Sequence, residues 1–420
     1  MRKLELVPPT EAMARLRSAL RGVVLPSEAI PTAQGRDRVL AEDVRAPIPM
    51  PEFRRSTVDG YAVRAADTPG TLRVVGEVRM GELAADALGP GEALAVPTGG
   101  NLPPGADAVV MAEDALPGDS ANQITITKQL APGENAIQEG EDVKAGEVVV
   151  RAGARLREQE IGGLLALGIT QVSVRRKPRV ALIASGDELV PAERPTKPGQ
   201  VRNINQPMLA ALVARNGGVP LDFGILPDRR EAFEEAAQRA MREADVIVFT
   251  AGSSVGERDF VPEVISGLGQ PGVLAHGILF RPGKPTLFAV CDGKPVFGLP
   301  GNPISTLITG TLFLAPALWL IQGAHTPPQA RLVRARLAQD VRSPRDLEHW
   351  FPVKLRLDDW HSADLTLIHE AYPISTKSNL IFGLVRADGM ACAPIGVDPV
   401  SYTHLRAHET PEHLVCRLLL

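Results

Sequence analysis

The chain has 420 residues, 44% of them hydrophobic and 22% charged, with a formal net charge of −4 at pH 7. This length predicts more than one domain, and the negative charge and an aromatic content of only 4% argue against a nucleic-acid partner. The three cysteines lack CxxC spacing, which excludes a disulfide framework or zinc knuckle and fits a reducing cytoplasm. The first residues contain no apolar run, so no secretion signal is predicted.

The N-terminal part predicts two helices separated by a β region. A helix is expected over residues 11–21 and another over 158–167, each followed by glycine. Between them, short apolar runs alternate with Pro and Gly turns, which is typical of a small β domain. We therefore predict an N-terminal helical domain of residues 1–46 and 148–178, with its two helices packed together, and an inserted β domain of residues 47–147.

Residues 179–325 predict an α/β domain with a doubly wound sheet, because apolar strands alternate with amphipathic helices. A hairpin is expected around Pro282 and Gly283, between residues 278–280 and 286–290. The expected strands are 180–184, 221–225, 246–250 and 295–299, and the expected helices are 206–216, 229–243, 262–268 and 304–321. The last helix is apolar but interrupted by polar residues and Pro316, so we expect a buried core helix and no membrane span.

The end of the chain predicts a small, barrel-like β domain over residues 330–400, where apolar and polar residues alternate. Residues 401–420 differ in character, since they hold three of the eight histidines. Their spacing on no clear helix makes a metal site a weak interpretation. The stretch resembles translated adapter DNA, so we expect a non-native tail without native contacts.

Chemistry-bearing residues gather where the expected strands end. Asp187 and Glu188 follow the first strand, a loop ending at Asp259 follows the third, and the turn 298–303 follows the last. Open α/β sheets bind ligands at the carboxyl ends of their strands. Carboxylates suit Mg²⁺, while glycine N–H groups and the nearby cations Arg281 and Lys284 suit an anion. The pattern predicts a site for a magnesium-bound phosphate compound.

Each of these features also has a structural interpretation. Loop carboxylates are usually solvated, cations are usually plain surface residues, and a Gly-Pro turn before a helix can be only a tight connection. The helix expected after Asn302 would, however, place Ser305 in its first turn, where an anion is favoured. No Walker A, GxGxxG, HExxH or GxSxG motif occurs, which disfavours common NTPase, dehydrogenase, metalloprotease and esterase functions.

Taken together, the motifs resemble the MoeA family of molybdopterin molybdenumtransferases, which includes the E domain of gephyrin. The order and spacing match over about residues 1–398. A MogA-like adenylyltransferase would share only the α/β part. The matching segments are 56–62, 97–100, 104–110, 140–142, 185–189, 252–259, 281–285 and 298–303.

The resemblance implies a reaction in which molybdate is inserted into the dithiolene of adenylylated molybdopterin and AMP is released, with Mg²⁺ required. It also implies an L-shaped homodimer of four-domain subunits, a MogA-like fold for the α/β domain, and a MogA-like adenylyltransferase as a candidate partner. Neither a nucleic acid nor a membrane is implied.

The resemblance also assigns roles by position. Asp187, Glu188 and Asp259 would handle Mg²⁺ and the pyrophosphate, and Arg281 and Lys284 would hold anionic groups. Asp228 is another predicted catalytic acid. The partner subunit would contribute the predicted catalytic acids Asp59 and Asp142, together with Thr98. Ser254, Lys284 and Pro285 would line the molybdate pocket, and the remaining predicted substrate-binding residues are Ser185, Gly186, Gly252, Ser253, Gly283, Pro300, Gly301, Asn302, Ser305 and Ser378.

Three departures from the family pattern concern the molybdate contacts. The loop 251–254 is one residue shorter than the commoner double-glycine form, and Arg281 stands where lysine is frequent. Residues 350–353 lack the arginine that the family often places near molybdate, although Ser378 matches the serine that joins it. These departures keep open an alternative function, a non-catalytic molybdopterin-binding or scaffold protein.

Overall fold

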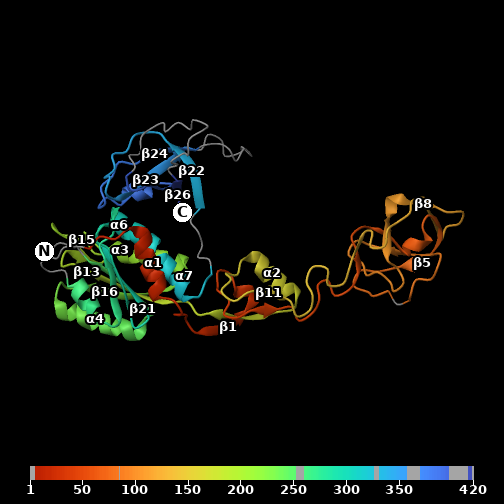
Figure 1. Cartoon of the computed structure of the whole chain (residues 1–420), viewed down its shortest axis with the longest axis horizontal. Helices are drawn as coiled ribbons and strands as arrows, with labels where there is room; N and C mark the ends of the chain where they lie inside the picture. The colour runs from red at the N-terminus through yellow and green to blue at the C-terminus, as the bar shows by residue number, and fades with distance from the viewer. Residues whose placement is uncertain are drawn as a thin grey trace.

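The computed structural model describes residues 5–84, 86–251, 260–325, 331–356, 369–396 and 415–418. The chain forms an elongated molecule with four parts (Figure 1). An α/β domain lies at one end with the C-terminal β domain beside it. A β domain that contains β5 (Gly70–Glu77) and β8 (Ala115–Pro117) lies at the far end, and a smaller α/β unit with α2 (Glu158–Ala166) lies between them.

The α/β domain is built on a six-stranded sheet in the order β16-β13-β17-β21-β20-β18. The first four strands are parallel, whereas β20 and β18 each run antiparallel to their neighbour. This arrangement puts the carboxyl ends of β13, β17 and β21 along one edge, as the sequence predicts. The bounds are β13 (Arg179–Ser185), β16 (Val219–Leu226), β17 (Val246–Ala251), β18 (Pro271–His276), β20 (Leu287–Cys291) and β21 (Lys294–Pro300).

Helices cover both faces of this sheet, so the predicted doubly wound arrangement is confirmed for this domain. Along β13, Val180 and Leu182 face a core formed with α3, α6 and α7, whereas Ala181 and Ile183 face a second core formed with α4 and α5. This alternation follows from the two-residue period of a strand. The helices are α3 (Asn205–Arg215), α4 (Arg230–Glu243), α5 (Val261–Ser266), α6 (Pro303–Thr309) and α7 (Ala315–Ile321).

The helical stretch from α6 to α7 is long and apolar enough to cross a membrane by length and composition, but 72% of it is buried inside the protein. Ile304, Phe313 and Leu318 pack into the same core as α3. A π-helical turn, Gly310–Leu314, joins the two helices just before Pro316. Proline cannot donate a backbone hydrogen bond, which accounts for the local change in helical pitch.

The hairpin predicted around Gly283 exists, but its first strand was wrongly placed. β18 ends at His276, which pairs with Leu287 of β20, so the connecting loop spans residues 277–286. β19 (Phe280–Arg281) leaves the hairpin and pairs in parallel with the C-terminal sheet. The apolar side chains of Ile278 and Phe280 stay in the α/β core, while the backbone of β19 pairs with another domain, which composition alone does not reveal.

The N-terminal helix also packs differently from the prediction. α1 (Pro9–Ala19) buries Ala12 and Leu16 in the α/β core, together with Phe288 and Ile321. α2 instead buries Leu164 in the core of the middle unit, to which the helix itself belongs. The two helices thus belong to different cores, because an apolar helix face does not specify which surface will cover it.

The middle unit is a mixture of strands and one helix. β1 (Ser27–Pro31) pairs antiparallel with β12 (Gln171–Arg175), and β2 (Val44–Arg45) pairs with β11 (Val148–Val150). These pairings bring the two ends of the chain segment that carries the inserted domain side by side. The core of the unit consists of Leu40, Leu156, Leu164, Val172 and Val174.

The inserted β domain has a six-stranded sheet in the order β7-β4-β6-β5-β9-β8, with cores on both faces. Neighbouring residues of β4 face opposite cores: Ala62 lies in one and Val63 in the other. A separate pair joins β3 (Arg55–Ser56) to β10 (Ala136–Ile137). The remaining strands are β4 (Gly60–Val63), β6 (Glu92–Val96), β7 (Ala108–Met111) and β9 (Gln123–Ile126).

The strand pairings of the C-terminal domain close into a ring, β23-β24-β22-β26-β25 and back to β23, as predicted for a barrel-like domain. β26 pairs with β22 and β25, so Val415–Leu418 makes contacts that the predicted tail was not expected to make. The non-native origin of residues 401–420 stays a prediction. The strands are β22 (Arg331–Leu337), β23 (Glu348–Arg356), β24 (His369–Pro373), β25 (Gly389–Ala393) and β26 (Val415–Leu418), with a short helix α8 (Phe382–Val385).

Candidate functional site

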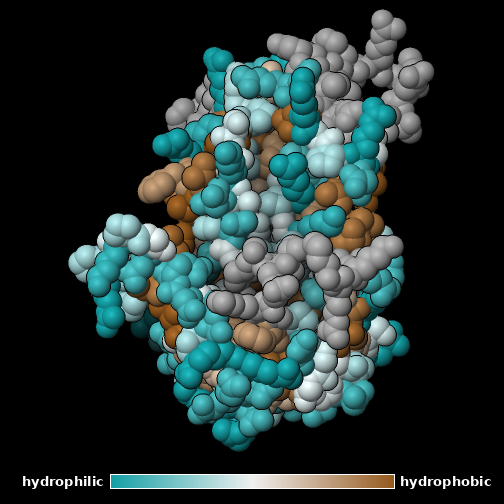
Figure 2. All heavy atoms as spheres, turned by 90° about the vertical axis from the view of Figure 1, so that its left-hand side faces the viewer, coloured by the Kyte–Doolittle hydropathy of each residue, from teal (hydrophilic) through white to brown (hydrophobic). Residues whose placement is uncertain are grey.

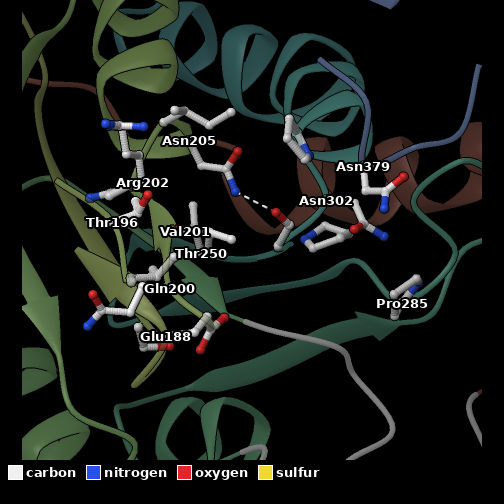
Figure 3. A pocket seen from close by; sticks show the side chains of 17 residues that line it. Glu188, Thr196, Gln200, Val201, Arg202, Asn205, Thr250, Pro285, Asn302 and Asn379 are labelled. Atoms are coloured by element: carbon white, nitrogen blue, oxygen red, sulfur yellow. Dashed lines mark hydrogen bonds between the residues drawn. The ribbon is translucent and has the colours of Figure 1, made fainter. Parts of the chain in front are cut away.

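A pocket of about 800 Å³ lies at the carboxyl ends of β13, β17 and β21. Several predicted site residues line it: Ser185, Glu188, Pro285, Pro300, Gly301 and Asn302. Glu188 and Arg202 enter from one side, and Asn302, Asn379 and Pro285 from the opposite side (Figure 3). The structure thus joins loops separated by more than one hundred residues, because parallel strands end at a common edge.

The predicted acids after β13 are exposed and close to the pocket. One carboxylate oxygen of Asp187 accepts a hydrogen bond from the backbone N–H of Asp228 at 3.2 Å, which joins two predicted acids. The Glu188 carboxylate lies against Gly186, where an added Cβ would come within 2.7 Å of one of its oxygens. Glu188 itself lines the pocket. These oxygens suit a hard divalent cation.

The start of α6 forms another wall. Asn302 precedes the helix and Pro303 occupies its first turn, as predicted, but the Asn302 side chain makes no capping hydrogen bond. Ser305 is buried rather than open to the pocket. The N–H of Ile304 donates to the carbonyl of Ser378 at 3.1 Å. This bond places the predicted Ser378 of the C-terminal domain at the start of α6.

The loop of residues 281–285, here called the cation loop, carries Arg281 and Lys284 as exposed side chains. Its last residue, Pro285, lines the pocket, while Arg281 at its start lies in β19. The buried Gly283 has a positive φ of 118°, and an added Cβ would lie 2.8 Å from a Thr309 methyl carbon. Only glycine therefore lets the loop pass this close to α6.

Asp59 and Thr98 form a second, separate cluster in the inserted β domain. One oxygen of the Asp59 carboxylate accepts hydrogen bonds from the backbone N–H of Thr98 at 2.7 Å and from its hydroxyl at 3.0 Å. These bonds lower the pKa of Asp59, the backbone one most strongly. Gly60 follows, where a Cβ would lie 1.9 Å from the carbonyl oxygen of Val110. The tight turn at Gly60 and the bonds from Thr98 therefore hold the Asp59 carboxylate exposed and favour its ionised form.

The described structure does not bring every predicted residue together. Asp142 is exposed, and its backbone N–H donates to Met50 at 3.0 Å, with no hydrogen bond to Asp59 or Thr98 among the described residues. The predicted residues Gly252, Ser253, Ser254 and Asp259 lie outside the described residues. In the described part of the chain no group of three His, Cys, Asp or Glu residues could hold a metal ion.

The pocket is also lined by residues that the sequence does not predict, among them the polar residues Gln200, Arg202, Asn205 and Asn379. The side-chain amide of Asn205 donates to the Gly301 carbonyl at 2.6 Å and so joins the start of α3 to the turn before α6 (Figure 3). A polar residue before a predicted helix is normally interpreted as a cap. The parallel pairing of β14 (Leu189–Val190) with β15 (Val201–Arg202) positions Gln200 and Arg202, and no local pattern signals it.

The surface of this end of the molecule is mainly hydrophilic, with hydrophobic side chains showing between the polar ones (Figure 2). This face contains the α/β domain and the C-terminal domain beside it. A polar surface around a polar-lined pocket suits a small charged ligand better than an apolar one.

Two protein families match the chain. Residues 7–168 match the MoeA N-terminal region (domain I and II), and residues 181–319 match a probable molybdopterin binding domain. Together these matches include the Asp59 cluster and every described pocket residue except Asn379.

The relatives span nearly the whole chain. A molybdopterin molybdenumtransferase of Staphylococcus epidermidis is 33% identical over 366 residues, covering 85% of each chain. That of Staphylococcus aureus is 30% identical over 401 residues, covering 93% of this chain and 92% of the relative. A crystal structure of the molybdopterin biosynthesis MoeA protein from Pyrococcus horikoshii superposes with a TM-score of 0.80 at 30% identity, covering 99% and 100% of the two chains. The chain therefore belongs to the MoeA family of molybdopterin molybdenumtransferases.

Proposed function

We propose that this transferase of molybdenum cofactor biosynthesis inserts molybdate into adenylylated molybdopterin and releases AMP, with Mg²⁺ and as a homodimer. The observation that carries the proposal is the pocket at the strand ends, lined by the family's loops, in a chain whose relatives are molybdopterin molybdenumtransferases. A cytoplasmic location and receipt of substrate from a MogA-like adenylyltransferase are parts of the same proposal.

The pocket supports cleavage of a phosphoanhydride. Negative charge develops on phosphate oxygens as AMP leaves, so fixed positive groups would lower the barrier. Arg281 and Lys284 of the cation loop would supply such charge, as would the backbone N–H groups at the start of α6. The dithiolene sulfurs of the substrate then take the metal from molybdate, since thiolates are strong ligands for it. The oxygen that displaces AMP would come from water or molybdate, and the oxo groups that the sulfurs displace would leave as water, so the protein itself needs no nucleophile.

Asp187 and Glu188 fit a magnesium site, because both are exposed carboxylates at the end of β13 and Glu188 lines the pocket. The Asp228 N–H orients Asp187 through one carboxylate oxygen, and within the described residues the other oxygen is available to a cation. Mg²⁺ bound there would neutralise charge on the pyrophosphate. Asp259 is proposed as the third acid.

A partner subunit is proposed because Asp59 and Thr98 lie far from the pocket of their own chain. The β domain that holds them occupies the opposite end of the molecule, beyond the middle unit (Figure 1). A second copy in an isologous dimer would bring this domain to the pocket and create two identical sites. Asp142 would join the composite site from the same partner.

Release of AMP from adenylylated molybdopterin tests the proposal. We expect release only when molybdate and Mg²⁺ are both present. The alternative, a non-catalytic molybdopterin carrier, predicts tight binding of the adenylylated substrate with no AMP release under any of these conditions. Binding measured by fluorescence of the pterin separates the carrier from a protein that does not bind the substrate.

A further inference from the structure

The C-terminal domain is joined to the cation loop through backbone pairing. β19 pairs in parallel with β23, which places Phe280 opposite Glu348 and Arg281 opposite His349. The N–H of Glu348 also donates to the carbonyl of Leu279 at 3.0 Å. Paired residues on adjacent strands point to the same face of a sheet. His349 is therefore the cross-domain neighbour of Arg281.

The cations of the loop have no protein counter-ion in the described part of the chain. Neither the Arg281 guanidinium nor the Lys284 ammonium makes an ion pair or a side-chain hydrogen bond there. By contrast, the Arg176 guanidinium pairs with the Asp245 carboxylate at 2.6 Å. The residue opposite Arg281 is an imidazole and not a carboxylate. The loop thus keeps its positive charge available for an added anion.

The His349 ring is held in a defined position. Its Nδ1 lies 2.7 Å from the Ser343 hydroxyl, and its ring centroid lies 5.3 Å from that of Phe351 on the same strand. Its other neighbour in the sheet is Ala393 of β25, which carries no charge. Glu348 points to the opposite face, where it accepts a hydrogen bond from the Trp350 indole at 2.6 Å. Nε2 makes no hydrogen bond within the described residues.

We propose that His349 is a positioning residue for Arg281, so that this cross-domain pair sets the affinity of the cation loop for a tetrahedral oxoanion. The inference rests on the proposed function only for the identity of the anion as molybdate. The ordered, uncharged ring of His349 beside Arg281 restricts the positions of the guanidinium. Because the ring carries no negative charge, the guanidinium keeps its full positive charge. A flexible exposed arginine would otherwise lose side-chain entropy on binding an anion.

The electrostatics of the pair support this role. Burial, and secondly the positive charge of Arg281, lower the pKa of His349 to about 4. Among the described residues, Arg281 on β19 is the charged group that acts on the ring, since its other neighbours Ser343 and Ala393 are uncharged. An oxoanion bound to Arg281 would offset that positive field and raise the pKa of His349. By linkage, oxoanion binding would take up protons and strengthen as pH falls.

Steady-state AMP release tests the role by variants. His349→Ala should raise the KM for molybdate about tenfold, the equivalent of about 1.4 kcal/mol, and leave kcat nearly unchanged. His349→Gln, which retains a partner for Ser343, should recover most of the affinity. The matched control is His325→Ala, which removes an exposed histidine elsewhere. Unchanged molybdate KM in a folded His349→Ala protein would overturn the proposal.

Proton NMR titration of the full-length protein tests the coupling without any activity. Sulfate serves as the probe, because it stays a tetrahedral dianion throughout the titration. Saturating sulfate should raise the pKa of His349, assigned from the spectrum of His349→Gln, by about one unit. In Arg281→Gln the pKa should already be raised, and sulfate should add nothing. An unresponsive His349 in the wild-type protein would refute the pairing even if AMP release is normal, whereas a normal response without AMP release would refute only the proposed function.

Discussion

Thr98 donates both its backbone N–H and its hydroxyl to a single carboxylate oxygen of Asp59, at 2.7 and 3.0 Å. The pair joins two turns of the inserted β domain, after β3 and after β6, that are nearly forty residues apart in sequence. Both residues are exposed. Such a pair has little to stabilise at a free surface, which is consistent with a carboxylate prepared for a substrate or a partner subunit.

We expect Thr98→Val to raise the pKa of Asp59 only part of the way to its usual value. The hydroxyl bond is lost, but the stronger backbone bond remains. Because the folded-state pKa of Asp59 is lowered, its contribution to stability is present above the unfolded-state pKa and is lost as pH falls through the folded one. NMR titration of the Asp59 carboxyl measures the shift. Thr125→Val, in the same sheet, should leave that pKa unchanged, and a shift there would contradict the assignment.

We expect Asp187→Asn, Glu188→Gln and Asp259→Asn each to reduce AMP release by roughly 10²-fold, because each removes a charge from the proposed magnesium site. The apparent Mg²⁺ requirement should rise in the first two variants, while their melting temperatures stay near that of the wild type. The matched control is Glu193→Gln, an exposed acid on the loop after β14. Full activity of Asp187→Asn at low Mg²⁺ would exclude a metal role for this residue.

We expect Gly283→Ala to destabilise the α/β domain and to abolish activity. The added methyl would meet Thr309 at 2.8 Å and Phe280 at 2.9 Å, and the backbone would keep an unfavourable φ of 118°. Overpacking and the backbone term together cost about 2–4 kcal/mol. Gly224→Ala provides the control, because Gly224 also has a positive φ but an added Cβ there would meet no atom of the described residues within 4 Å. Equal losses of melting temperature in the two variants would show that close packing against α6 contributes nothing.

We expect a mixture of two inactive homodimers to recover activity if the site is shared between subunits. Asp142→Ala and Asp187→Ala would be unfolded together and reassembled. Random pairing makes half of the dimers mixed, each with one intact site, so activity should reach roughly a quarter of the wild-type value. Absence of recovery, with mixed dimers proven by mass spectrometry, would assign Asp142 and Asp187 to the same subunit's site.

The secondary structure of this chain could be predicted well where periodicity is strong. The helix expected over 229–243 is observed as Arg230–Glu243, and the strand expected over 246–250 as Val246–Ala251. The predictions are wrong where packing between residues distant in sequence decides which surfaces meet. The apolar face of α1 was assigned to α2 but packs on the α/β core, and Phe280 leaves its hairpin to join another domain's sheet.

The site could be predicted in part, for a physical reason. Parallel strands place their following loops at one edge, so Glu188 and Asn302 line one pocket, which Pro285 joins from the loop between the antiparallel strands β18 and β20. Asn205 was missed because its amide supports a distant turn, and Asn379 because its contribution depends on how two domains pack. The position of His349 beside Arg281 depends on a strand pairing between domains that no local pattern encodes.

The most direct test of the account compares two products of a single turnover. Purified protein would be loaded with adenylylated molybdopterin in the presence of Mg²⁺, and molybdate would then be added. AMP would be quantified by chromatography, and molybdenum in the isolated pterin by mass spectrometry. The proposed reaction releases one AMP for each molybdenum incorporated, and neither product forms without molybdate. AMP released in equal amount without molybdate, or molybdenum incorporated without AMP, would contradict it.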